Sequence, residues 1–170
     1  GVTNPDKVEV TVDSGASQSV WPRKMKGVRR YYEKPPKLIA ANGTAIPAYG
    51  RAVLGFQRGG VKGEMKFWDA DVKKPLGAVS AMIDEGNTVV FSSKKSYIRN
   101  DLSGEEIEIK RKGGTFVIEL SRDTKVQPKK KEEKGRMEIG SAEEEKDKQW
   151  EKLVRERYGD GEVVFRRQAR

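Results

Sequence analysis

The sequence predicts a mostly β domain with one short helix, followed by a charged tail that contains a second helix. Short segments of β-branched and apolar residues recur at regular spacing and are separated by glycine-containing turns. The composition changes near Arg122, after which Lys, Arg and Glu dominate. We therefore predict one folded domain over residues 1–121.

The strands of this domain are predicted from alternation of side-chain character. Val8–Val12 alternates and leads directly into Asp13. Asn42-Gly43 predicts a hairpin with a two-residue turn, because such a turn needs positive φ at both positions and Asn and Gly adopt it readily. Further strands are predicted at Lys37–Ala41, Thr44–Tyr49, Arg51–Phe56, Glu64–Val72, Val89–Phe91, Ser96–Arg99, Glu106–Lys110 and Thr115–Leu120.

Two helices are predicted, one in the body and one in the tail. The first is Ala78–Glu85, which Gly86 ends as the residue after the C-cap. Residues 122–140 are predicted to be a charged linker. In the C-terminal region 141–170, a capping box at Ser141 opens a helix that is expected to continue to Tyr158.

Composition excludes several kinds of chemistry. The chain has neither Cys nor His, so thiol nucleophiles, Ser-His couples and zinc sites built from these residues are excluded. Proton transfer must then use Asp, Glu, Lys or Tyr. We expect no metal and no cofactor.

Charge and hydropathy indicate which partners and which cellular compartment to expect. The net charge of +9 comes from 35 Lys and Arg against 26 Asp and Glu. The two signs are interleaved, which argues against a dedicated nucleic-acid surface. No segment approaches the roughly 18 apolar residues of a membrane span, so we expect no membrane partner. The absence of Cys fits a reducing compartment and predicts an intracellular, cytoplasmic protein.

One motif has the character of a catalytic site. The predicted strand at Val8–Val12 delivers the carboxylate of Asp13 into a turn formed by Ser14 and Gly15, with Ala16 next. A strand end holds a carboxylate rigidly, and glycine allows backbone donors or a ligand to approach it closely. An apolar segment, Val20-Trp21-Pro22, follows.

This segment resembles the active-site loop of retropepsin-like aspartic proteases. Leu76-Gly77, which leads into the predicted helix, is similar to the second signature of that family, although Pro75 replaces its first apolar residue. The segments Leu38–Thr44 and Leu76–Phe91 resemble the proteases of copia-type retrotransposons. The resemblance covers about residues 7–120 and does not include the tail.

The resemblance implies a fold and a site. The fold would be the closed β-barrel of one retropepsin-like half, with Asp13 as catalytic residue in the loop Ser14, Gly15 and Ala16. The hairpin of residues Ala41, Asn42, Gly43 and Thr44 would be the flap that covers substrate. Asp13 would lie within about 10 Å of the loop that ends at Leu76-Gly77, a limit set by the spacing of packed sheets.

The resemblance also implies a homodimer, because aspartic proteases need two facing carboxylates. No second Asp-Ser-Gly or Asp-Thr-Gly occurs in the chain, so each copy would donate one Asp13. The activity would be endopeptidase cleavage of an extended polypeptide, such as a retroelement polyprotein. Two alternatives remain open: a catalytically inactive dimerisation or scaffold module, and a basic nucleic-acid-binding β domain.

Overall fold

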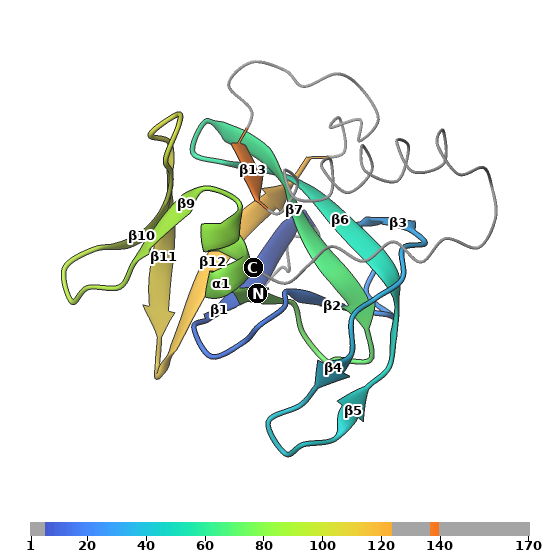
Figure 1. The fold of residues 1–170 in the computed structure, drawn as a ribbon. Helices are drawn as coiled ribbons and strands as arrows, with labels where there is room; N and C mark the ends of the chain where they lie inside the picture. Colours follow the sequence, from blue (N-terminus) through green and yellow to red (C-terminus); the bar gives the residue numbers. More distant parts are fainter. Residues whose placement is uncertain (1–5, 124–136, 140–170) are drawn as a thin grey trace, which may run out of the picture.

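The computed structural model describes residues 6–123 and 137–139, and Figure 1 shows how their elements are arranged. The described chain is mostly β, with one six-residue helix. The elements are β1 Lys7–Asp13, β2 Val20–Pro22, β3 Arg29–Tyr31, β4 Leu38–Ile39, β5 Ala45–Ile46, β6 Ala48–Arg58, β7 Val61–Ala70, β8 Leu76–Ala78, α1 Val79–Asp84, β9 Asn87–Val90, β10 Ser96–Asn100, β11 Glu106–Lys112, β12 Thr115–Arg122 and β13 Met137–Ile139.

Most strands belong to one strongly curved sheet. Its order is β3-β6-β7-β2-β8-β1-β12-β11-β10-β9, and β13 pairs with β7 beside this path. A further antiparallel pairing joins β12 to β6 at Ser121↔Gln57, so the path of paired strands from β6 through β1 returns to β6. Strands β4 and β5 form a separate two-stranded sheet. Pairing is mainly antiparallel, and β1–β8, β2–β7 and β13–β7 are the parallel pairs.

The hairpin of β6 and β7 is the longest pairing in the sheet. Its strands are joined by Gly59 and Gly60, whose φ values are 53° and 86°. A two-residue turn of this kind needs positive φ at both positions, which glycine adopts without steric cost. The sequence expectation of two strands separated by these glycines is confirmed.

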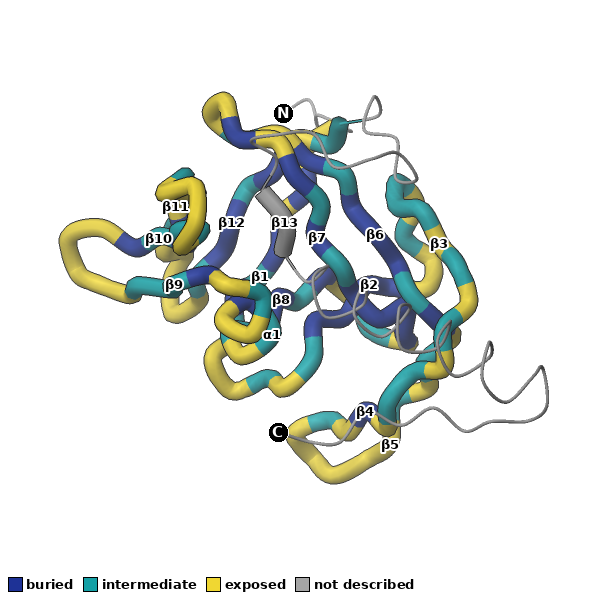
Figure 2. The backbone as a smooth tube through the Cα atoms, turned by 45° about the horizontal axis from the view of Figure 1, so that its top comes forward, coloured by how far each residue is buried: buried dark blue, intermediate teal, exposed yellow. Residues whose placement is uncertain are grey.

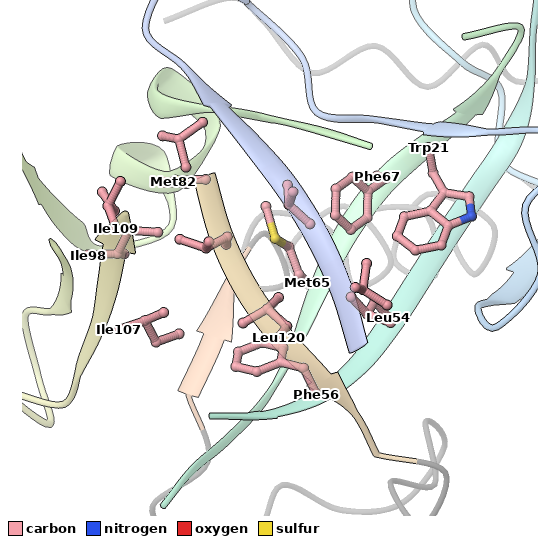
Figure 3. Packing of buried hydrophobic residues seen from close by; sticks show 14 of the residues in the cluster. Trp21, Leu54, Phe56, Met65, Phe67, Met82, Ile98, Ile107, Ile109 and Leu120 are labelled. Atoms are coloured by element: carbon pink, nitrogen blue, oxygen red, sulfur yellow. The ribbon is translucent and has the colours of Figure 1, made fainter. Parts of the chain in front are cut away.

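The core lies between the curved strands, where alternate residues of each strand point inward (Figure 3). Trp21 is fully buried, lies 5.2 Å from Phe67 between ring centroids, and donates its indole N–H to the carbonyl of Met25 at 3.0 Å. Figure 2 shows that the central strands are the most buried part of the backbone. Trp21, Phe67 and Trp68 are therefore core residues.

The helix agrees with the sequence prediction to within one residue at each end. Helix α1 has Ala78 as N-cap and Glu85 as C-cap, and Gly86 follows with φ of 86°. Because only glycine takes this left-handed conformation freely, the predicted helix stop is confirmed. Among the described residues, no helix is long and apolar enough to cross a membrane.

The hairpin around Asn42 differs from the prediction in its turn. Gly43 has φ of 86°, but no residue other than glycine has positive φ, so Asn42 does not occupy a two-residue type I′ turn. Ile39 pairs with Ala45, and the amide of Ala40 donates to the carbonyl of Thr44 at 2.8 Å, which leaves residues 41–43 as the loop. The amide of Gly43 donates to the carbonyl of Ala40 at 2.9 Å. The loop therefore has three residues, a tight turn followed by a left-handed glycine.

Strands β2, β3 and β8 of the body were not predicted, and part of the predicted linker forms a strand of the sheet. Each of these three strands is only three residues long, which is too short to show a clear alternation. Residues 137–139, inside the predicted linker of 122–140, form β13 in parallel register with Gly63–Met65. The helix expected from Ser141 lies outside the described residues.

Candidate active site

The candidate site is centred on Asp13, the last residue of β1. Strand β1 is flanked by β12 on one side and by β8 on the other. Val8, Val10 and Val12 are buried, so the apolar face of β1 fixes the strand in the core up to the residue before the carboxylate. The side chain of Asp13 is half-buried, whereas Ser14 and Gly15 are exposed.

The loop after β1 curls back on the carboxylate. The amide of Gly15 donates a 2.7 Å hydrogen bond to Oδ1 of Asp13. A Cβ at Gly15 would lie 3.3 Å from the same oxygen, which is tighter than ordinary contact. The absence of a side chain at this position therefore lets a backbone donor orient one carboxylate oxygen, and no hydrogen bond from another described residue engages Oδ2.

The second sequence signature lies directly beside the carboxylate. Parallel pairing places Val12 opposite Gly77 and Asp13 opposite Ala78. These residues are register partners on neighbouring strands, about 5 Å apart, so the expected proximity of Asp13 to Leu76-Gly77 is confirmed.

Gly77 lies in a close packing contact, and its backbone conformation is one that any residue can adopt. A Cβ at this position would lie 2.7 Å from the terminal methyl of Met82 and 2.8 Å from that of Met65. Its φ is not in the left-handed range. The glycine therefore lets β8 lie close to the core behind Asp13.

Two hydroxyl groups tie the loop that follows Asp13 to the end of β8 and the start of α1. Ser19, which is 5% exposed, accepts a 2.9 Å hydrogen bond from the amide of Ala78. Ser80 donates to the carbonyls of Ala16 and Ser17 at 3.2 and 3.4 Å. The loop is thus held in its middle by Ser80 of α1 and near its C-terminal end by Ala78.

These two serines were not predicted as site residues. Ser19 directly precedes the buried Val20 and Trp21. A hydroxyl residue next to an apolar segment indicates a buried hydrogen bond, and this is the signal by which Ser19 could have been found. Ser80 carries no such signal, because its partners are backbone carbonyls of a loop 63 and 64 residues earlier.

The predicted flap residues lie at the tip of the β4–β5 hairpin, which projects away from the main sheet in Figure 1. Ala41, Asn42, Gly43 and Thr44 are all exposed. Oδ1 of Asn42 accepts hydrogen bonds from the amide and the hydroxyl of Thr44 at 3.1 and 2.6 Å. Among the described residues, the hydrogen bonds of this tip stay within the hairpin, and none joins it to Asp13.

The chemistry that this arrangement can support depends on one oriented carboxylate. Within the described ranges, no three His, Cys, Asp or Glu residues gather closely enough to hold a metal ion. The chain therefore presents a half-exposed carboxylate with one fixed backbone donor at the end of a rigid strand. Such a group can act as a general base, or as a general acid when protonated.

Comparisons of the chain with models of protein families, with curated proteins and with solved structures found no match.

Proposed function

We propose that this protein is an aspartic endopeptidase of the retropepsin-like type, in which Asp13 is the catalytic residue. The observation that carries the proposal is the combination of the Asp13–Gly15 hydrogen bond with the parallel pairing of Asp13 and Ala78. The two sequence segments that resemble the signatures of the family are thereby neighbours in space. The return of the strand path to β6 supports a closed barrel.

The proposed reaction needs a second carboxylate, and a second copy of the chain supplies it. Two carboxylates about 3 Å apart share one proton, because both cannot be ionised at that distance. The ionised member removes a proton from water, and the water oxygen attacks the scissile carbonyl carbon. The protonated member donates to the carbonyl oxygen. Attack of water produces a tetrahedral intermediate. The carboxyl group that took the proton from water then returns it to the nitrogen, and the C–N bond breaks as the amine leaves.

The surface around Asp13 supports contact with a second copy. Phe116 lies opposite Val12 and packs edge-on against Phe91, with 4.8 Å between ring centroids. Phe91 remains 38% exposed and Ile83 on α1 is 52% exposed. Strand β9, just before Phe91, has β10 as its one neighbour among the described strands. A second copy that covers this apolar surface would bring its own carboxylate to the site.

The β4–β5 hairpin is the proposed flap. Its exposed tip has backbone groups that an extended peptide could pair with, and its closure would exclude water from the site. Ala41, Asn42, Gly43 and Thr44 would then be substrate-contacting residues.

The test is cleavage of an extended peptide library by the full chain. Asp13→Asn should abolish cleavage, since one substitution removes both catalytic carboxylates of a symmetric dimer. Asp101→Asn is the control, because it makes the same change at an exposed carboxylate in the turn after β10. Equal cleavage by Asp13→Asn and the parent would remove Asp13 from the mechanism. No cleavage by a parent that is dimeric in the same buffer would favour the inactive scaffold.

A further inference from the structure

Most of the net positive charge of the chain lies in one segment, at the end of the strand order opposite to β9. Residues 23–37 contain seven basic residues and one acidic residue. Their net charge of +6 is two thirds of the +9 carried by the whole chain. The segment includes β3, the terminal strand of the sheet order, whose one strand neighbour is β6. Figure 2 shows this margin as exposed or intermediate backbone.

The segment is folded into one compact surface rather than extended as an arm. The guanidinium of Arg30 donates from Nη2 to the carbonyls of Pro22, Arg23 and Met25 at 3.2, 3.0 and 2.6 Å. It thereby holds the loop after β2 against β3. Arg23 and Arg30 share the buried carboxylate of Asp69 at 2.9 and 3.1 Å.

Most of the positive charge on this surface is not neutralised. Glu33, the one acidic residue of the segment, is paired with Arg51 at 3.1 Å. Asp69 is shared by two arginines and leaves a net positive charge on that group. Five basic residues have no carboxylate partner in the described part of the chain: Lys24, Lys26, Arg29, Lys34 and Lys37.

Aromatic side chains are interleaved with these charges. Tyr32 is 80% exposed, which is unusual for a large aromatic ring beside a sheet. The guanidinium of Arg23 lies 4.4 Å from the ring centroid of Tyr49, which is itself 40% exposed. Gly50 lies against the backbone of Tyr31 and Tyr32, so the segment that carries Tyr32 is next to the bulge that carries Tyr49.

We propose that this surface, defined as Arg23, Lys24, Lys26, Tyr32, Lys34 and Tyr49, binds single-stranded nucleic acid. Unpaired lysines attract phosphates, and binding releases the counterions condensed on the strand. Exposed aromatic rings and a stacked guanidinium offer planar faces on which unpaired bases stack. An acidic peptide would use the charges but would gain nothing from the exposed rings, so the surface fits a nucleic acid better. The proposal does not depend on peptidase activity.

The test is fluorescence anisotropy of a labelled 15-nucleotide oligouridine with the full chain, measured from about 0.05 to 0.2 M salt, a range over which phosphate contacts weaken strongly. The charge variant is Lys24→Gln/Lys26→Gln/Lys34→Gln. Its control, Lys7→Gln/Lys62→Gln/Lys94→Gln, removes the same charge from exposed lysines elsewhere. Every variant keeps the basic tail run at Lys129-Lys130-Lys131, so differences report on the folded domain.

The charge variant should bind up to about 100-fold more weakly at 0.1 M salt, and its log–log salt slope should be smaller by about 2, since each single-strand phosphate contact contributes about 0.7. Tyr32→Ala should weaken binding about tenfold through lost stacking. Leu102→Ala, which alters a residue that is 99% exposed, should leave binding unchanged.

Four results would overturn the proposal. One is no binding by the parent at the lowest salt concentration. Another is equal binding by the charge variant and its control, and a third is equal binding by Tyr32→Ala and the parent. The fourth is competition by polyglutamate as strong as that by unlabelled oligouridine, which would assign the surface to acidic chains in general.

Discussion

The hydroxyl of Ser19 accepts a 2.9 Å hydrogen bond from the amide of Ala78 across 59 residues of sequence. This bond joins the loop that follows Asp13 to the strand that lies beside Asp13. Because both groups are buried, water cannot replace either partner. The position of the candidate carboxylate therefore depends on a contact that is remote from it in sequence.

Ser19→Ala should lower the free energy of unfolding by about 1–3 kcal/mol, since it leaves a buried amide without an acceptor. Urea denaturation measures this change. Ser17→Ala is the control, because Ser17 is exposed and contributes its backbone carbonyl to the bond with Ser80. Equal stability of the two variants would show that the Ser19 bond does not hold the loop.

Gly77→Ala should destabilise the domain by about 1–3 kcal/mol, because its methyl group would enter the space of Met65 and Met82. Gly114→Ala is the matched control, since a Cβ there meets nothing within 4 Å. Thermal unfolding of both variants measures the difference. A Gly77→Ala variant as stable as the control would mean that the two methionines move aside at no cost.

Phe91→Glu should prevent dimerisation, because a buried unpaired charge is unfavourable at an apolar contact. Sedimentation velocity of the full chain over a concentration series measures this. Leu102→Glu introduces the same charge at a position that is 99% exposed, on the turn after β10, and should leave the dimer intact. The proposed interface is wrong if both variants dimerise like the parent.

The phenol of Tyr31 should ionise well above the usual pKa of a tyrosine. Burial, with a smaller contribution from Glu33, raises the pKa of Tyr31 to about 12. In the unfolded chain this phenol ionises near pH 10, so above that pH the unfolded state binds fewer protons and stability falls as pH rises. Tyr31→Phe should show a shallower loss of stability between pH 10 and 12, measured by urea denaturation. Identical slopes would contradict the assignment.

Local signals predicted the elements with distinct sequence patterns. The alternation of β1, the glycine after α1 and the paired glycines between β6 and β7 are properties of neighbouring residues, and each agrees with the structure. Strands β2, β3 and β8 were missed because three residues give no period. The turn at Asn42 was wrong because loop length is set by the pairing of Ile39 with Ala45, which the dipeptide does not determine.

Only the part of the candidate site that lies in short local motifs could be predicted from the sequence. Asp13 and Gly77 stand in short motifs, whereas Ser19 and Ser80 act through backbone groups about 60 residues away. The charges also look evenly mixed along the whole chain, although five basic residues between Lys24 and Lys37 have no carboxylate partner in the described structure. Ion pairing depends on the fold, so the sequence alone could not reveal this surface.

Mixing parent and Asp13→Asn chains tests most directly whether two copies share one site. A fixed amount of parent is titrated with the variant at concentrations where both are dimeric, and cleavage of one peptide is followed. Cleavage should fall towards zero as parent chains enter mixed dimers with a single ionisable carboxylate. Titration with Asp101→Asn should raise cleavage instead. Undiminished cleavage in excess Asp13→Asn would contradict the shared dyad, because each parent chain would then be active by itself.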